Sequence, residues 1–107
     1  MKKNNTFSIG DRSITFLHKI MSVDKVKDGY LVILNYWCDA DLNYSFEDNI
    51  YKLNDNLEIQ WQIQGYKPRC YVGIFVDEKN FRAISCDGMS VETDMATGKT
   101  ISEKFVK

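Results

Sequence analysis

The chain has 107 residues and a formal net charge of −1, with 44% hydrophobic, 27% charged and 13% aromatic residues. This length predicts a single domain over residues 1–107, and the composition excludes a disordered chain. No window approaches the ~18 apolar residues of a membrane helix, so we expect no spanning segment. The lysines near the N-terminus are not followed by an apolar run, so we expect no export signal.

The first third of the chain predicts two hairpins. Residues 7–9 and 13–17 are short apolar pieces on either side of Gly10, and we expect them to form an opening hairpin or an edge strand. Residues 20–26 and 30–37 follow, joined at an Asp-Gly pair that is typical of two-residue turns.

Residues 30–37 are apolar on both faces of the predicted strand, with Val32 and Leu34 on one face and Leu31 and Ile33 on the other. A half-exposed strand would instead alternate apolar and polar residues. This strand should therefore be central and covered on both sides, or its outer face should meet a partner.

Residues 38–48 differ from the strands around them, because they mix acidic and aromatic residues with no period. We interpret them as a long loop without structure of its own, and such loops in compact domains are usually functional. Charge is also uneven along the chain. Residues 37–66 hold six acidic residues against one lysine, a balance of −5, whereas residues 1–27 hold six basic against two acidic residues, a balance of +4. The acidic middle favours a basic partner and argues against nucleic acid.

Residues 57–63 show the cleanest alternation in the chain. Four apolar residues alternate with Glu and Gln, which predicts a strand with one buried face that includes Trp61. A connector at 65–69 follows, and its Pro68 cannot donate to a strand ladder. This connector divides the strands into two groups, about 7–63 and 71–106.

The last third, 71–106, predicts four strands joined by three tight turns. The turns fall at 77–80, 87–88 and 96–98, and Gly88 and Gly98 can supply the positive φ that hairpin turns need. No apolar pattern of helical period runs long enough to predict a long helix. The fold class is therefore all-β, an antiparallel β-sandwich of about eight strands in two four-stranded sheets.

Two segments resemble blades of quinoprotein-like β-propellers. Asp94-x-x-Thr97-Gly98-Lys99 is similar to the turn between the outer strands of such blades, and residues 57–61, which end in Trp61, are similar to a last blade strand. The resemblance covers two blades, about 20–63 and 71–106. Because a closed propeller needs roughly four or more blades, two such sheets would pack face to face, and no cofactor or metal chemistry of that family is implied here.

The sequence contains few residues in patterns typical of catalytic or metal sites. His18 is the only histidine, and Cys38, Cys70 and Cys86 lack the paired spacing of zinc ligands. We expect the cysteines to be buried, free thiols of a cytoplasmic protein. Asp39-x-Asp41-x-Asn43 begins like a calcium loop but lacks the later glycine and glutamate. The sequence therefore predicts no enzyme, no metal and no cofactor.

In size, lack of catalytic groups and acidic surface, the chain resembles the immunity proteins that accompany contact-dependent or polymorphic toxins of bacteria. This resemblance implies a protein that neutralises a cognate nuclease-type toxin by blocking its active site. A nuclease is basic where it holds phosphates, so an acidic surface with aromatic anchors suits it. The candidate partner-binding residues are Asp39, Asp41, Tyr44, Phe46, Glu47 and Asp48.

Two alternatives stay open. The chain could be a small carbohydrate- or ligand-binding β module, or a partial propeller that assembles with copies of itself. Neither a nucleic acid nor a membrane is an expected partner.

Overall fold

The computed structural model describes residues 5–35, 37–39, 44–45 and 47–105, and it describes side chains outside residues 36–46. These residues form twelve strands and no helix. The strands are β1 (Thr6–Ile9), β2 (Arg12–Thr15), β3 (Ile20–Val26), β4 (Gly29–Leu34), β5 (Trp37–Asp39), β6 (Tyr44–Ser45), β7 (Ile50–Leu53), β8 (Ile59–Gln62), β9 (Tyr71–Val76), β10 (Asn80–Ser85), β11 (Met89–Asp94) and β12 (Thr100–Phe105).

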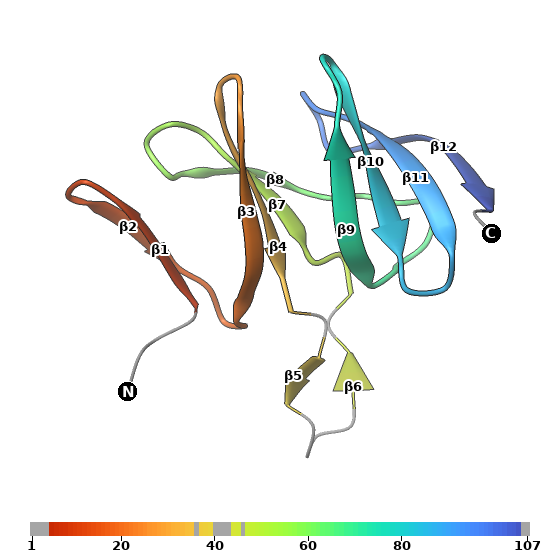
Figure 1. Ribbon diagram of the computed structural model, residues 1–107, viewed down its shortest axis with the longest axis horizontal. Coiled ribbons are helices and arrows are strands. Elements are labelled where there is room, and N and C mark those ends of the chain that lie inside the picture. Colours follow the sequence, from red (N-terminus) through yellow and green to blue (C-terminus); the bar gives the residue numbers. More distant parts are fainter. Residues whose placement is uncertain (1–4, 36, 40–43, 46, 106–107) are drawn as a thin grey trace.

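Two four-stranded antiparallel sheets form the body of the molecule (Figure 1). The first sheet has the order β3-β4-β7-β8 and the second has the order β12-β11-β10-β9. Two further pairs, β1-β2 and β5-β6, are separate hairpins. The prediction of an all-β fold with two four-stranded sheets is confirmed, and the hairpins add four strands to the eight expected.

A hydrophobic cluster lies between the two sheets and holds them face to face. Burying one large apolar side chain contributes about 1.5–3 kcal/mol, so a cluster of this size is the main force between the sheets. Its buried members are Val26, Leu31, Ile33, Ile50, Trp61 and Ile63 on the side of the first sheet and Tyr71, Phe81, Ala83 and Val91 on the side of the second.

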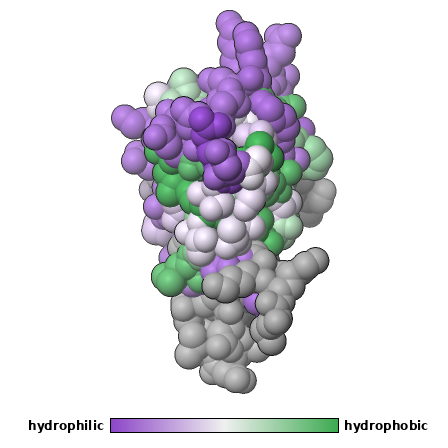
Figure 2. Space-filling view, turned by 90° about the vertical axis from the view of Figure 1, so that its left-hand side faces the viewer, coloured by the Kyte–Doolittle hydropathy of each residue, from purple (hydrophilic) through white to green (hydrophobic). Residues whose placement is uncertain are grey.

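Strand β4 is covered on both faces, as its sequence predicts. Leu31 and Ile33 point into the cluster between the sheets, while Val32 and Leu34 belong to a second cluster on the opposite face of the first sheet. The β1-β2 hairpin covers that second face, and Phe16, directly after β2, is buried in the cluster. Figure 2 looks at this side of the molecule and shows mostly hydrophilic residues over its upper part, with hydrophobic ones between them.

The last third folds as its turn residues predict. Strands β9 to β12 follow one another in the sheet, and their turns fall at the predicted breaks. Gly88 has φ 90° and Gly98 has φ 77°, which are conformations that glycine adopts without strain.

The predicted strand over 57–63 is only partly correct. Strand β8 begins at Ile59, which is 50% exposed, and Leu57 is buried in the second cluster instead of the first. Leu57 has φ 65° in the turn after Asn54, and the β7-β8 register shifts between Lys52 and Leu53. The turn and the shift break the alternation, so only Trp61 and Ile63 point into the core between the sheets.

Candidate functional site

The sequence singles out residues 38–48; together with Trp37 they are here called the acidic projection, residues 37–48. It contains the short strands β5 and β6, in which Asp39 lies opposite Tyr44. The prediction of a loop without structure of its own is therefore wrong. Aromatic residues such as Trp37 and Tyr44 favour extended backbone. Strand β5 follows β4 and strand β6 leads into β7, and because β4 and β7 are paired, the two segments lie side by side. Figure 1 places the pair outside both sheets, beyond the ends of those two strands.

The structure describes four of the six candidate partner-binding residues. Asp39 and Tyr44 are paired through their backbones in β5 and β6. Glu47 is exposed and Asp48 is half-buried. Asp41 and Phe46 lie outside the described residues.

Asn49 anchors the base of the acidic projection. Its side chain is fully buried and donates from Nδ2 to the carbonyl oxygens of Leu34, at 2.7 Å, and Tyr71, at 2.8 Å. Its Oδ1 accepts the main-chain N–H of Tyr71 at 2.8 Å. The main-chain N–H of Leu34 also donates to the Asn49 carbonyl at 2.9 Å. One side chain thus ties both ends of the projection to the first strand of the second sheet.

The charges near this base lack a cationic partner. Within the described residues, neither Glu47 nor Asp48 forms an ion pair. Burial raises the pKa of Asp48 above its ordinary value; a main-chain hydrogen bond from Arg69 offsets part of this rise, and the neighbouring Glu47 adds to it. Asp48 also lies at φ 55°, and its main-chain N–H donates to the Arg69 carbonyl at 2.8 Å. This corner of the projection therefore carries negative charge that the rest of the described chain leaves uncompensated.

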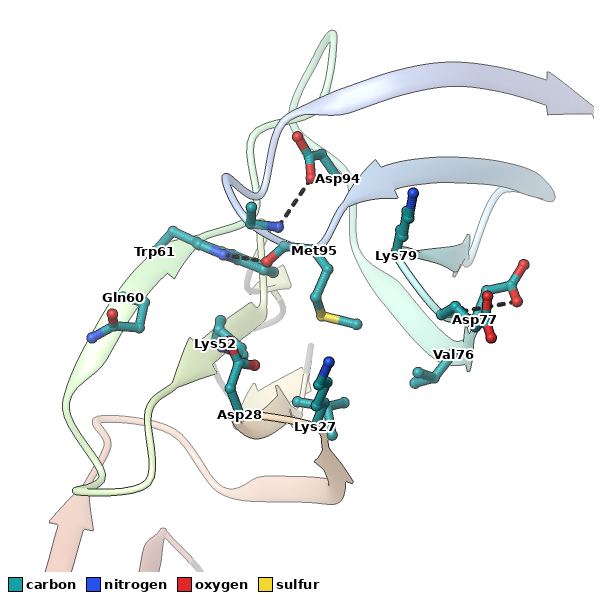
Figure 3. Close-up of a pocket in the computed structure, with 13 residues that line it drawn as sticks. Lys27, Asp28, Lys52, Gln60, Trp61, Val76, Asp77, Lys79, Asp94 and Met95 are labelled. Carbon is teal, nitrogen blue, oxygen red and sulfur yellow. Dashed lines mark hydrogen bonds and ion pairs between the residues drawn. The ribbon is translucent and has the colours of Figure 1, made fainter.

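A second candidate site is a cleft of about 930 Å³ between the turn ends of the two sheets (Figure 3). The β3-β4, β9-β10 and β11-β12 turns line its rim, and β7 and β8 supply its inner wall. The cleft is lined by residues that are far apart in the sequence, so no local pattern could predict it.

Most charged groups of the cleft already form ion pairs or hydrogen bonds within the chain. Lys52 is buried, and its Nζ lies 3.1 Å from Asp28 Oδ1. This contact lowers the pKa of the Asp28 carboxyl. The carboxylates of Asp77 and Asp94 accept main-chain N–H groups of their own turns, from Glu78 and Ala96 at 3.0 Å each. Among the described residues that line the cleft, Lys27, Glu78 and Lys79 form no ion pair.

Trp61 forms part of the cleft wall but is only 9% exposed. Its ring stacks on Phe81 with the centroids 5.8 Å apart, and its indole N–H donates to the Met95 carbonyl at 3.0 Å. A Cβ on Gly98 would lie 2.5 Å from the ring, so the backbone touches Trp61 there. The prediction that Trp61 is a core residue is confirmed. Its contacts leave little of the ring for stacking against a sugar.

A partly buried polar cluster lies beside the start of β9. The guanidinium of Arg69 pairs with Asp87 at 2.8 Å and with Glu103 at 3.0 Å, although the Arg69 side chain is only 7% exposed. These bonds tie the connector to the β10-β11 turn and to β12. The fully buried Tyr71 is close to this cluster, and its hydroxyl has no hydrogen-bond partner among the described residues.

The raised pKa of the buried Tyr71 predicts that the folded chain loses stability at alkaline pH. Burial raises its pKa from 10 to about 12 in the folded chain. Above pH 10 the unfolded chain therefore loses this proton while the folded chain keeps it, so stability falls as the pH rises. The loss should reach roughly 2–3 kcal/mol by pH 12. Denaturant titrations between pH 8 and 12 should show this loss to be greater in the wild type than in Tyr71→Phe.

Comparing the wild type with Tyr71→Phe also tests whether the Tyr71 hydroxyl lacks a hydrogen-bond partner. At pH 8 we expect Tyr71→Phe to be as stable as the wild type or slightly more stable, because no described hydrogen bond is lost. A loss of more than about 1 kcal/mol at pH 8 would show that the hydroxyl has a partner.

The sequence did not predict a role for two side chains of these sites, Asn49 and Lys52. Lys52 interrupts an apolar strand between Tyr51 and Leu53, and a charge at a position that alternation makes buried is a signal that could have been used. Asn49 carries no comparable signal, because its partners lie on β4 and β9.

The described residues offer no metal centre. They contain no group of three or more His, Cys, Asp or Glu side chains placed to hold a metal ion. They also contain no helix long and apolar enough to cross a membrane. Gly98 and Lys99 lie in the β11-β12 connection, and Thr100 begins β12. Cys70 is buried, but Cys86 is exposed, because it begins the β10-β11 turn; the expectation that it is buried is wrong. The side chain of Cys38 lies outside the described residues.

Comparison with known proteins gives a family match over almost the whole chain. The model of a family described as Domain of unknown function (DUF7957) matches residues 1–105. No curated protein and no solved structure matches the chain.

Proposed function

Because the chain belongs to the family described as Domain of unknown function (DUF7957), we propose its function from its own residues: it is a non-enzymatic protein that binds a basic protein partner through the acidic projection. The partner class that fits is a nuclease-type bacterial toxin, which the chain would neutralise in the cytoplasm by covering the active site. The observation that carries this proposal is the uncompensated negative charge of a projection whose base is anchored.

The anchoring supports binding because it reduces the cost of ordering the interface. Asn49 fixes both ends of the projection against β9, so less conformational freedom is lost when a partner docks. The four acidic residues of the projection, with no lysine or arginine among residues 37–48, would steer a basic partner toward it. Tyr44, on β6, is the aromatic anchor proposed to fill a pocket on that partner.

Charge reversal tests the proposal. The partner to use is the protein encoded by the neighbouring gene, co-expressed and purified as a complex. We expect Asp39→Lys, Asp41→Lys and Glu47→Lys together to slow association at least tenfold at low salt and to remove most of its salt dependence. Stopped-flow mixing between 20 mM and 500 mM salt measures both. Asp48 is left unchanged, because its positive φ and partial burial would make a lysine there disturb the fold.

Two control variants separate steering from anchoring and from folding. Tyr44→Ala should leave association nearly unchanged and accelerate dissociation, as expected when an anchor is lost. Reversing the exposed Glu58, on the turn before β8, should change neither rate. Tight, salt-independent binding by the triple reversal would reject the projection as the docking surface, and the search would move to the exposed Gln60, Gln62 and Gln64.

The cleft supports a second candidate function, the binding of a small ligand. Its volume of about 930 Å³ is within the range of ligand sites, and Lys27 and Lys79 on its rim favour an anionic group. The two functions are separable, because a ligand in the cleft would raise the melting temperature without any protein partner. A Lys79→Ala variant should lose that rise while keeping the toxin interaction.

A further inference from the structure

The free cysteines Cys70 and Cys86 lie opposite each other in neighbouring strand segments. The β9-β10 register pairs Tyr71 with Ser85, so the next pair outward is Cys70 and Cys86. The main-chain N–H of Cys86 donates to the Cys70 carbonyl at 2.8 Å, which continues the ladder past the end of both strands. The chain thus brings together two thiols that are sixteen positions apart in the sequence.

This pairing suits a disulfide. Opposed residues of an antiparallel pair hold their Cα atoms about 4.5–5.5 Å apart, which lies within the range of about 4.4–6.8 Å that disulfides span. The two thiols also interact directly with each other. Closing the bond therefore requires a change of side-chain rotamers and little movement of the backbone.

We propose that Cys70 and Cys86 are a redox-active dithiol that closes reversibly to an intrachain disulfide when the chain meets a small disulfide such as oxidised glutathione. First, the Cys86 thiolate attacks one glutathione sulfur, forming a mixed disulfide and releasing one glutathione thiolate. The Cys70 thiolate then attacks the Cys86 sulfur and releases the second glutathione. The chain loses two electrons and two protons, and the two glutathione thiolates take up the protons.

The exposure of the two residues sets the order of these steps. Cys86 is exposed and can meet the oxidant, whereas Cys70 is buried and resolves the mixed disulfide from within. Desolvation and the neighbouring Cys70 raise the pKa of Cys86. The thiolate is the attacking species, so the exchange should be slow at neutral pH.

The disulfide would fasten the connector to the β10-β11 turn. Cys70 follows Arg69, and Cys86 precedes Asp87, the residue with which Arg69 pairs. The bond would thus add a covalent link beside an existing ion pair. It would also close a loop of roughly 15 residues in the unfolded chain, which stabilises the folded state. We expect the melting temperature of the oxidised chain to exceed that of the reduced chain by about 10–15 °C.

The test is overnight incubation of the purified, folded chain with oxidised glutathione at pH 8, followed by alkylation and tryptic mass spectrometry. The expected product links the peptide 70–79 to the peptide 83–99 and leaves Cys38 free to be alkylated. Dithiothreitol should restore all three thiols and the lower melting temperature. Cys38→Ser should give the same linked peptides, and Cys86→Ser should give none.

Three results would overturn the proposal. One is a product in which glutathione stays on Cys86 and Cys70 is alkylated. Another is a link that involves Cys38. The third is a wild type whose Cys70 and Cys86 are both alkylated after incubation. Because the wild type itself is measured, a variant that fails to fold would not obscure the outcome.

Discussion

Replacing Asn49 by alanine should lower the free energy of unfolding by about 3–6 kcal/mol. The substitution leaves three buried main-chain groups without their partner, namely the carbonyls of Leu34 and Tyr71 and the N–H of Tyr71. Each unsatisfied buried group costs about 1–3 kcal/mol. Since whole domains are stable by only about 5–15 kcal/mol, this single change would bring the chain close to unfolding.

Urea denaturation followed by tryptophan fluorescence measures this loss. Asn56→Ala is the matched control, because Asn56 is exposed in the β7-β8 turn and its side chain should contribute less than about 0.5 kcal/mol. If Asn49→Ala cost no more than that control, water would be able to replace the amide, and the base of the acidic projection would not depend on it.

Replacing Gly29 by alanine should be at least as damaging. A Cβ at Gly29 would lie 1.8 Å from the Leu53 carbonyl oxygen and 2.9 Å from its carbon. Leu53 is paired with Tyr30 across the β4-β7 ladder and is fully buried. Room for a methyl group can therefore be made only by moving β7 away from β4. We expect a loss of at least about 4–5 kcal/mol, or a chain that does not fold.

A second glycine provides the comparison for Gly29. At Gly73, on β9, a Cβ would meet nothing within 4 Å, so Gly73→Ala should be neutral or stabilise the chain by up to about 1 kcal/mol. Circular dichroism and urea midpoints of the two variants, prepared in parallel, give the result. Equal midpoints would mean that the contact between β4 and β7 is much looser than the distances indicate.

The parts of the fold that sequence predicts well are those whose causes are local. The turns near Gly88 and Gly98 need a positive φ, and glycine supplies it wherever the rest of the chain lies. The two-sided coverage of β4 also follows from its own residues, because a strand that is apolar on both faces must be covered twice.

The features that sequence missed depend on partners far along the chain. Leu57 alternates with its neighbours, yet a turn at positive φ places it in the opposite cluster. Asn49 reaches β9, and Arg69 reaches Glu103 on β12. The approach of Cys70 to Cys86 depends on the β9-β10 register. A polar residue's type reveals that it needs a partner, but the fold decides which partner it finds.

The order of strands within the second sheet has a kinetic consequence. Strands β9 to β12 pair only with their neighbours along the chain, so each step of assembling this sheet closes a short loop. Short loops close at little entropic cost, and β-hairpins form within microseconds. The slower event should be docking of the two sheets, which must bring Trp61 against Phe81 and Asn49 against Tyr71. Substitutions at these docking contacts should therefore slow folding. A destabilising change in the β11-β12 turn should slow folding as well, because this turn forms before the sheets dock.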